Sequence, residues 1–308
     1  MTSALSCGDS LLFVGTWIGS TPERDSTFFA LDPVIGEIKW AKILKSVQNS
    51  PIVVDSVVYI PSLSRLFAFT LNGDSLWSAP KGWGSPVYWN NKIYHQYDAI
   101  LYARNALTGD SIWALSLPGE CDWLVVLHNT IFVSTSHYPY DILMAVNSET
   151  GSVLWKKGDF PCTSILMTLG SDDNLITTRA YWGDTPEDTV WEEIWSFNPH
   201  NGDTSWTQTI SNGRGGGGGV ITHDGNLWFS SQWIYLIELE SGEILYTSED
   251  VPGNWTPPAF QWGNVFFPII YKNYLIGAHE SFVYCYEGDT VAPPEDTVYD
   301  FTFYSYQT

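Results

Sequence analysis

A short phrase recurs along the chain, and it constrains the fold more than any other feature. Each copy has an apolar run, a polar turn that usually opens with Asp or Asn, a glycine and, four residues after that glycine, a large aromatic ring. The rings are Trp40, Trp77, Trp113, Trp155, Trp206 and Tyr246, which follow Gly36, Gly73, Gly109, Gly151, Gly202 and Gly242. A spacing repeated this often indicates a repeat architecture.

The phrase has the pattern of a β-hairpin, because an apolar strand runs into a polar turn with a glycine and then into a second strand. A second hairpin pattern lies upstream of most copies, at 51–60, 86–95, 124–133, 220–229 and 268–277. Four strands per repeat follow, at intervals typical of propeller blades. The sequence predicts an all-β, seven-bladed β-propeller of four-stranded antiparallel blades over residues 1–289; a solenoid is the alternative.

The phrase A-x-[DN]-x-x-[TSN]-G-x-x-x-W resembles the tryptophan-docking repeat of pyrroloquinoline-quinone-type propellers over residues 4–289. That family includes quinoprotein alcohol dehydrogenases, the propeller lipoprotein of outer-membrane assembly and many secreted proteins. Its dehydrogenases carry adjacent cysteines and calcium ligands over the quinone. Because this chain has no Cys-Cys pair, the resemblance implies a member without the quinone, and we expect no cofactor.

The charge of the chain limits the classes of molecule that it can bind. The chain has 13 Lys and Arg against 34 Asp and Glu, a formal net charge of −21. So acidic a chain is a poor partner for nucleic acid or anionic membranes. No apolar run is long enough for a membrane-spanning helix, and no basic-then-apolar signal peptide is visible at the start. Together with the resemblance, this predicts an extracellular, periplasmic or cell-surface location.

The strand order predicts two unequal faces. The first-to-second and third-to-fourth turns of each blade share one side and are short, whereas the second-to-third loops and the links between blades share the other. The three insertions, at 16–27, 178–193 and 247–267, all fall on this second side. Because function concentrates in variable loops on a rigid frame, we expect a protein or a glycan to bind there.

The candidate ligand-binding residues of that face are aromatic rings, histidines and one arginine, which suit stacking on sugars or holding a peptide. Their alternative role is to cover the core beneath their own loops. The set comprises His95, Tyr97, His137, Tyr140, Trp182, Arg214, Trp233, Trp255, Trp262 and His279. By contrast, His128 and His200 belong to the tight turns and are expected to be exposed.

No familiar catalytic or metal-binding pattern is present. The glycine run that follows Arg214 has the composition of an anion-binding nest, but a crowded crossing of the backbone is the simpler interpretation. The acidic loops at 184–189 and 294–298 are at most weak calcium sites, because they lack the ligand spacing of a calcium loop. Cys121 and Cys162 fall at corresponding places in successive blades, so they are a candidate disulfide in an exported protein.

The seventh phrase breaks off after Gly288 into a Pro-rich and acidic linker, and an aromatic segment follows within 290–308. This segment has the composition of a strand that completes the last blade, pairs with another copy or begins a further domain. We therefore expect a non-catalytic, secreted or cell-surface binding or assembly module. The alternatives are an enzyme at the channel mouth, either a degenerate quinoprotein or a glycan-active protein, and a structural subunit of an extracellular fibre.

Overall fold

The computed structural model contains only β-strands and their connections in the residues that it describes. These are 6–8, 11–15, 25–45, 47, 49–63, 65–80, 82, 84–136, 140–161, 165–169, 174–181, 191–211, 218–221, 225–230, 234–247, 269–271, 274–279, 282–287 and 302–305. The strands form seven four-stranded sheets, and in each sheet the spatial order follows the chain order. All neighbouring strands are antiparallel. The predicted β-propeller of four-stranded blades is confirmed.

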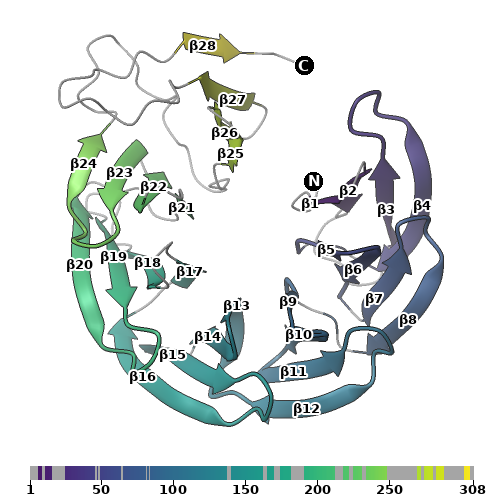
Figure 1. Ribbon diagram of the computed structural model, residues 1–308, viewed down its shortest axis with the longest axis horizontal. Coiled ribbons are helices and arrows are strands. Elements are labelled where there is room, and N and C mark those ends of the chain that lie inside the picture. The colour runs from purple at the N-terminus through teal and green to yellow at the C-terminus, as the bar shows by residue number, and fades with distance from the viewer. Residues whose placement is uncertain are drawn as a thin grey trace. The chain divides into compact units, whose positions relative to one another are not determined.

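The first compact unit, residues 1–161, contains four sheets (Figure 1). Sheet 1 comprises β1 (Ser6–Gly8), β2 (Leu11–Gly15), β3 (Asp25–Leu31) and β4 (Ile38–Lys45). Sheet 2 comprises β5 (Ile52–Val54), β6 (Val57–Pro61), β7 (Arg65–Thr70) and β8 (Ser75–Pro80). Sheet 3 comprises β9 (Val87–Trp89), β10 (Lys92–Tyr97), β11 (Ile100–Asn105) and β12 (Ser111–Ser116). Sheet 4 comprises β13 (Glu120–Leu127), β14 (Thr130–Ser136), β15 (Tyr140–Asn147) and β16 (Val153–Pro161).

The second compact unit, residues 162–308, contains the other three sheets. Sheet 5 comprises β17 (Ile165–Leu169), β18 (Leu175–Tyr181), β19 (Trp191–Phe197) and β20 (Thr204–Ser211). Sheet 6 comprises β21 (Gly218–Ile221), β22 (Asn226–Ser230), β23 (Ile234–Glu238) and β24 (Ile244–Thr247). Sheet 7 comprises β25 (Ile269–Tyr271), β26 (Tyr274–His279), β27 (Phe282–Glu287) and β28 (Thr302–Ser305).

The recurring phrase forms the third and fourth strands of a sheet, and its turn chemistry is as predicted. In sheet 3 the carboxamide Oδ1 of Asn105 accepts the backbone N–H of Leu107 at 2.9 Å, and Gly109 follows with a φ of 74°. Asn147 and Gly151 play the same parts in sheet 4. A left-handed φ favours glycine, because a Cβ would crowd the backbone there.

A β-bulge that the sequence did not reveal recurs just before the phrase turn. The register of the third and fourth strands shifts between Ala103 and Arg104 in sheet 3, and at corresponding residues in sheets 1, 2, 4, 5 and 6. The ring of the phrase always lies one step from the shift, as in the pair Ala103 and Trp113. Because a bulge bends its strand and re-aims side chains, its repetition gives the rings a common setting.

Apolar side chains from successive sheets make the core within each unit. Phe13 and Phe28 of sheet 1 are fully buried with Val58 and Ile60 of sheet 2. A second cluster joins sheets 3 and 4 around Tyr94, Leu101, Ile131 and Val133, and a third joins sheets 5 and 6 around Ile194, Phe229 and Ile237. Each interface buries the inward residues of both sheets, which is the packing that stacked propeller blades require.

Three long connections join strands at the end of the sheets that was predicted for the insertions: 16–24 between β2 and β3, 182–190 between β18 and β19, and 248–268 between β24 and β25. A fourth, 288–301 between β27 and β28, joins strands at the other end of its sheet. The predicted insertions were too wide, because β3 already begins at Asp25, β18 continues to Tyr181 and β19 begins at Trp191. Among the described residues there is no helix with the length and apolar character needed to cross a membrane.

Candidate functional site

Each sheet has two ends that could carry a functional site. We call the end with the first-to-second and third-to-fourth turns the turn end, and the end with the second-to-third loops and the links between sheets the loop end. At the turn end, recurring rings form hydrogen bonds from one sheet to the next. The indole N–H of Trp40 donates to the carbonyl oxygen of Leu71 in the next sheet at 2.7 Å. The same bond joins Trp77 to Ala106 at 2.8 Å, Trp113 to Ser148 at 3.0 Å and Trp206 to Leu239 at 2.7 Å. The predicted structural role of these four residues is therefore what the structure shows.

The glycines of the phrase make room for these rings. A Cβ on Gly109 would come within 2.7 Å of the Trp77 ring, and a Cβ on Gly151 within 2.9 Å of the Trp113 ring. The first copy differs, because no described residue lies within 4 Å of the place where a Gly36 Cβ would be. Trp155 and Tyr246 occupy the same register in their own sheets, opposite Ala145 and Leu236.

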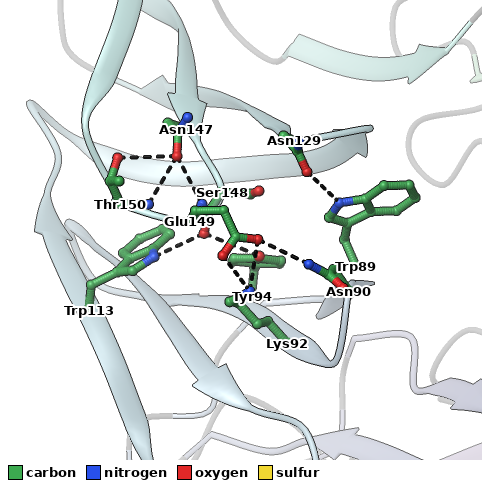
Figure 2. A network of polar contacts seen from close by, with 10 residues as sticks. All are labelled: Trp89, Asn90, Lys92, Tyr94, Trp113, Asn129, Asn147, Ser148, Glu149 and Thr150. Carbon is green, nitrogen blue, oxygen red and sulfur yellow. Dashed lines mark hydrogen bonds and ion pairs between the residues drawn. The ribbon is translucent and has the colours of Figure 1, made fainter.

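Figure 2 shows the polar network around one docked ring, between sheets 3 and 4. The carbonyl oxygen of Ser148 accepts both the Trp113 N–H and the Tyr94 O–H, the latter at 3.2 Å. The carboxylate of Glu149 accepts Lys92 Nζ at 2.8 Å and Asn90 Nδ2 at 3.2 Å. The hydrogen bond from Lys92, then that from Asn90, lowers the pKa of Glu149. These groups satisfy one another, so the network holds the blades together and offers little to a ligand.

Several other residues of the turn end are exposed. His128 and His200 lie on tight turns and are exposed, as predicted. The side chains at the tips of two phrase turns are apolar and project into solvent, with Val34 87%, Ile35 70% and Leu107 73% exposed. Val34 and Ile35 are neighbours on one short turn, and Leu107 lies on another. Scattered apolar residues of this kind are common on protein surfaces and mark no site.

The ligand residues were predicted to lie at the loop end, and the structure describes few of them. Tyr97 ends β10 and is half-buried beside the tight turn at Asp98. Tyr140 begins β15 and His279 ends β26, so the backbone of both lies at this end, whereas their side chains are outside the description. The remaining candidates fall outside the described residues: His137, Trp182, Arg214, Trp233, Trp255 and Trp262.

His95 is not at an exposed face, and this expectation was wrong. Its side chain is fully buried, because β10 continues past it to Tyr97. The His95 ring stacks on Tyr102 of β11, with ring centroids 5.2 Å apart. Burial, and then the guanidinium of Arg104, lowers the pKa of His95 from 6.5 to about 3. The imidazole is therefore neutral at ordinary pH and forms part of the core.

Arg104 is a buried charged residue that the sequence did not single out. Its Nε donates to His95 Nε2 at 3.0 Å, its Nη1 donates to the carbonyl oxygen of Gly109 at 3.1 Å, and its guanidinium lies 5.5 Å from the centre of the Tyr102 ring. Burial lowers the pKa of Arg104. Other copies of the phrase have an apolar residue at this place, such as Leu31 or Val146, and that departure from the repeat was the available signal.

Cysteine and metal chemistry contribute nothing to either end in the part of the chain that is described. Cys121 is buried in β13, and its Sγ lies 3.7 Å from the carbonyl oxygen of Trp123. The predicted partner Cys162 is outside the described residues, so the disulfide remains a prediction. No cluster of three or more potential metal ligands occurs among the described side chains. The two acidic loops considered for calcium also fall outside them.

Comparison with protein families gives one match. A family model of the PQQ type, described as "Outer membrane protein assembly factor BamB", matches residues 62–268. These residues run from the end of β6 almost to β25 and include five of the six rings. No curated protein matches the sequence.

Comparison with solved structures shows the fold again. BamB from Moraxella catarrhalis is 17% identical, with a TM-score of 0.63, and the match covers 89% of this chain and 79% of that one. Hsv2p from Kluyveromyces lactis is 9% identical at a TM-score of 0.62, with 97% and 95% covered. The WD40 propeller domain of Doa1 is 13% identical at 0.52, with 75% of each chain covered. At such low identity these likenesses show the propeller fold alone.

Proposed function

The chain belongs to the family described by the outer membrane protein assembly factor BamB, and on this premise we propose that it is a non-catalytic module that binds a protein partner during assembly outside the cytoplasm. The observation that carries the proposal is the asymmetry of the sheets. The connections 16–24, 182–190 and 248–268 leave from the loop end, and 288–301 in sheet 7 is the one long connection at the turn end given by the strand bounds. In sheets 3 and 4 the turn end has short turns whose polar groups bond to one another.

The chemistry of the loop end supports a protein partner. The three long connections contain Trp17, Trp182, Trp255 and Trp262, together with carboxylates and amides. Aromatic side chains are enriched at protein interfaces, where they contribute most of the binding energy when they enter a pocket on the partner. Binding residues concentrate on loops that a rigid frame of packed sheets positions.

Site-specific photo-crosslinking tests the proposal. A photoreactive phenylalanine analogue placed at Trp182 or Trp255 samples the loop end, and the same analogue at Ile35 or Leu107 samples the exposed turn end. We expect a protein crosslink from the loop-end positions in cells that produce the chain, and none from the turn-end positions. Equal crosslinking from both ends, or from the turn end alone, would refute the assignment of the face.

The location is tested separately by cell fractionation with a protease-protection assay. We propose that the chain lies in the periplasm or at the cell surface, so it should be digested once the outer barrier is opened while the cytoplasmic membrane remains intact. Protection under that condition, with a cytoplasmic control protein equally protected, would contradict the location.

A glycan array with wild type and Trp255→Ala examines the alternative ligand class.

A further inference from the structure

The last sheet regains its aromatic ring from a distant part of the chain. The sequence phrase of this sheet stops at Gly288, yet β28 pairs with β27 and places Tyr304 opposite Cys285. Cys285 in turn faces Ile276 of β26, just as Ala145 faces Phe132. Because Ala145 faces Trp155 on its other side, Tyr304 stands where the other sheets carry their Trp or Tyr.

The connection to this ring differs from all the others. The third and fourth strands of sheets 3 and 4 are joined by 106–110 and 148–152, whose backbones close on an Asn and a glycine. The connection from β27 to β28 is 288–301, and it contains Pro293, Pro294 and four carboxylates. A stretched segment of this length can reach about 45 Å. Prolines and like charges favour such extension over a tight reversal.

A short turn leaves a strand no choice of partner, because the strand must fold back on its own neighbour. A connection of 14 residues removes that constraint, so an identical β27 on another molecule offers β28 the same pairs. The four residue pairs from Tyr284–Ser305 to Glu287–Thr302 would be kept unchanged. Exchange of an identical element between copies is a low-cost route to association for this reason.

We propose that β28 is an exchangeable strand and that its second acceptor is β27 of another copy of this chain. The interaction surface is the outer edge of β27, and the partner is the segment Thr302–Ser305 of the second copy with Tyr304 opposite Cys285. Strand addition to an open edge gains its affinity from main-chain hydrogen bonds, and side chains such as Tyr304 give it register and selectivity. This proposal does not depend on the loop end or on its partner.

The pair Cys285 and Tyr304 provides a direct test, because Tyr304→Cys would set two thiols opposite each other. Cross-strand Cβ atoms lie about 4.5–5.5 Å apart, close to the span of a disulfide. Two differently tagged full-length Tyr304→Cys chains are unfolded, mixed, refolded together and then oxidised, at low and at high protein concentration. We expect a disulfide-linked dimer that carries both tags and whose share rises with concentration. Only intrachain disulfides at every concentration, or no disulfide with Cys285, would overturn the proposal.

Two matched variants control the test. Phe303 pairs with Tyr286 and not with Cys285, so Phe303→Cys should not form the Cys285 bond. Neither should Tyr304→Cys combined with Cys285→Ser. In a separate variant with the native Tyr304, residues 288–301 are replaced by the turn sequence of 148–152, which forces pairing within one chain. Sedimentation should then show monomer where the native linker gives dimer. Dimer in the short-turn variant would also overturn the proposal.

Discussion

The indole N–H of Trp113 in sheet 3 donates to the carbonyl oxygen of Ser148 in sheet 4, and the hydroxyl of Tyr94 donates to the same oxygen. The acceptor is a backbone atom in the phrase turn of the next blade. The ring that the sequence places four residues after a glycine therefore binds the turn of the following copy. In this way the repeat specifies the contact between blades as well as the blade itself.

Trp113→Phe should lower the free energy of unfolding by about 1 kcal/mol, the usual net value of a hydrogen bond. The benzene ring keeps part of the packing, and Tyr94 still satisfies the Ser148 oxygen. Trp113→Ala should cost about 3–5 kcal/mol, because it also removes the ring from the interface. Urea unfolding measures both. Equal losses in the two variants would show that ring burial contributes nothing beyond the hydrogen bond.

Gly109→Ala should destabilise the protein more than Gly36→Ala. Both glycines have a φ near 70°, so both variants incur the same left-handed strain of about 1–2 kcal/mol. Only the Gly109 methyl group would collide with a docked ring, that of Trp77, and such overpacking adds about 1–3 kcal/mol. The difference between the two measured losses in unfolding free energy gives the contribution of the collision with the ring, separate from backbone strain. Indistinguishable losses would contradict the close packing of ring on glycine.

Stability should fall on mild acidification because of His95. Its folded pKa of about 3 lies below the ordinary 6.5, so from pH 6.5 downward the unfolded chain takes up a proton that the folded chain does not. Above pH 6.5 the residue is neutral in both states and contributes no slope. Between about pH 7.5 and 5 the loss should be on the order of 2 kcal/mol.

His95→Gln is the control for that slope, since glutamine can still accept a hydrogen bond from Arg104 but does not titrate. The difference in unfolding free energy between wild type and His95→Gln should change with pH below 6.5 and be constant above it. A pH-independent difference would mean that His95 protonates in the folded protein.

The ion pair between Lys92 and Glu149 should matter less than the ring beside it. Glu149→Gln removes the charge but leaves an oxygen that can accept from Lys92 and Asn90. Because Glu149 is open to solvent, we expect a smaller loss than for Trp113→Phe, and one that disappears at high salt. A loss that persists at high salt would show a larger structural role for the carboxylate.

Much of the fold could be predicted because the repeat encodes it locally. The glycine at each phrase turn, the Asx oxygen before it and the ring after it are fixed by backbone sterics and hydrogen bonding over a few residues. The insertions could be assigned to one end, since antiparallel strand order alone decides which connections share a side. The bulge before the turn could not be seen, because it leaves the sequence spacing unchanged.

The candidate site was harder to predict because it depends on contacts between separate strands. Histidine is a residue type often found in binding sites, so His95 was predicted to face a ligand. The structure places it inside β10, where its side chain is buried and accepts a hydrogen bond from Arg104. The aromatic segment after the linker was recognised as a strand that could complete the last sheet, but its sequence did not reveal that Tyr304 takes the ring position. In both cases the deciding fact was strand register, which composition does not specify.

The most direct test of the account is the affinity of the crosslinked partner for two matched variants, measured by isothermal titration calorimetry. One variant replaces the connection 182–190 at the loop end with a two-residue turn, and the other carries Leu107→Asp at the turn end. The account predicts a loss of at least tenfold for the first and unchanged affinity for the second, about 1.4 kcal/mol or more against none. Unchanged affinity in the loop variant together with a loss in Leu107→Asp would contradict it.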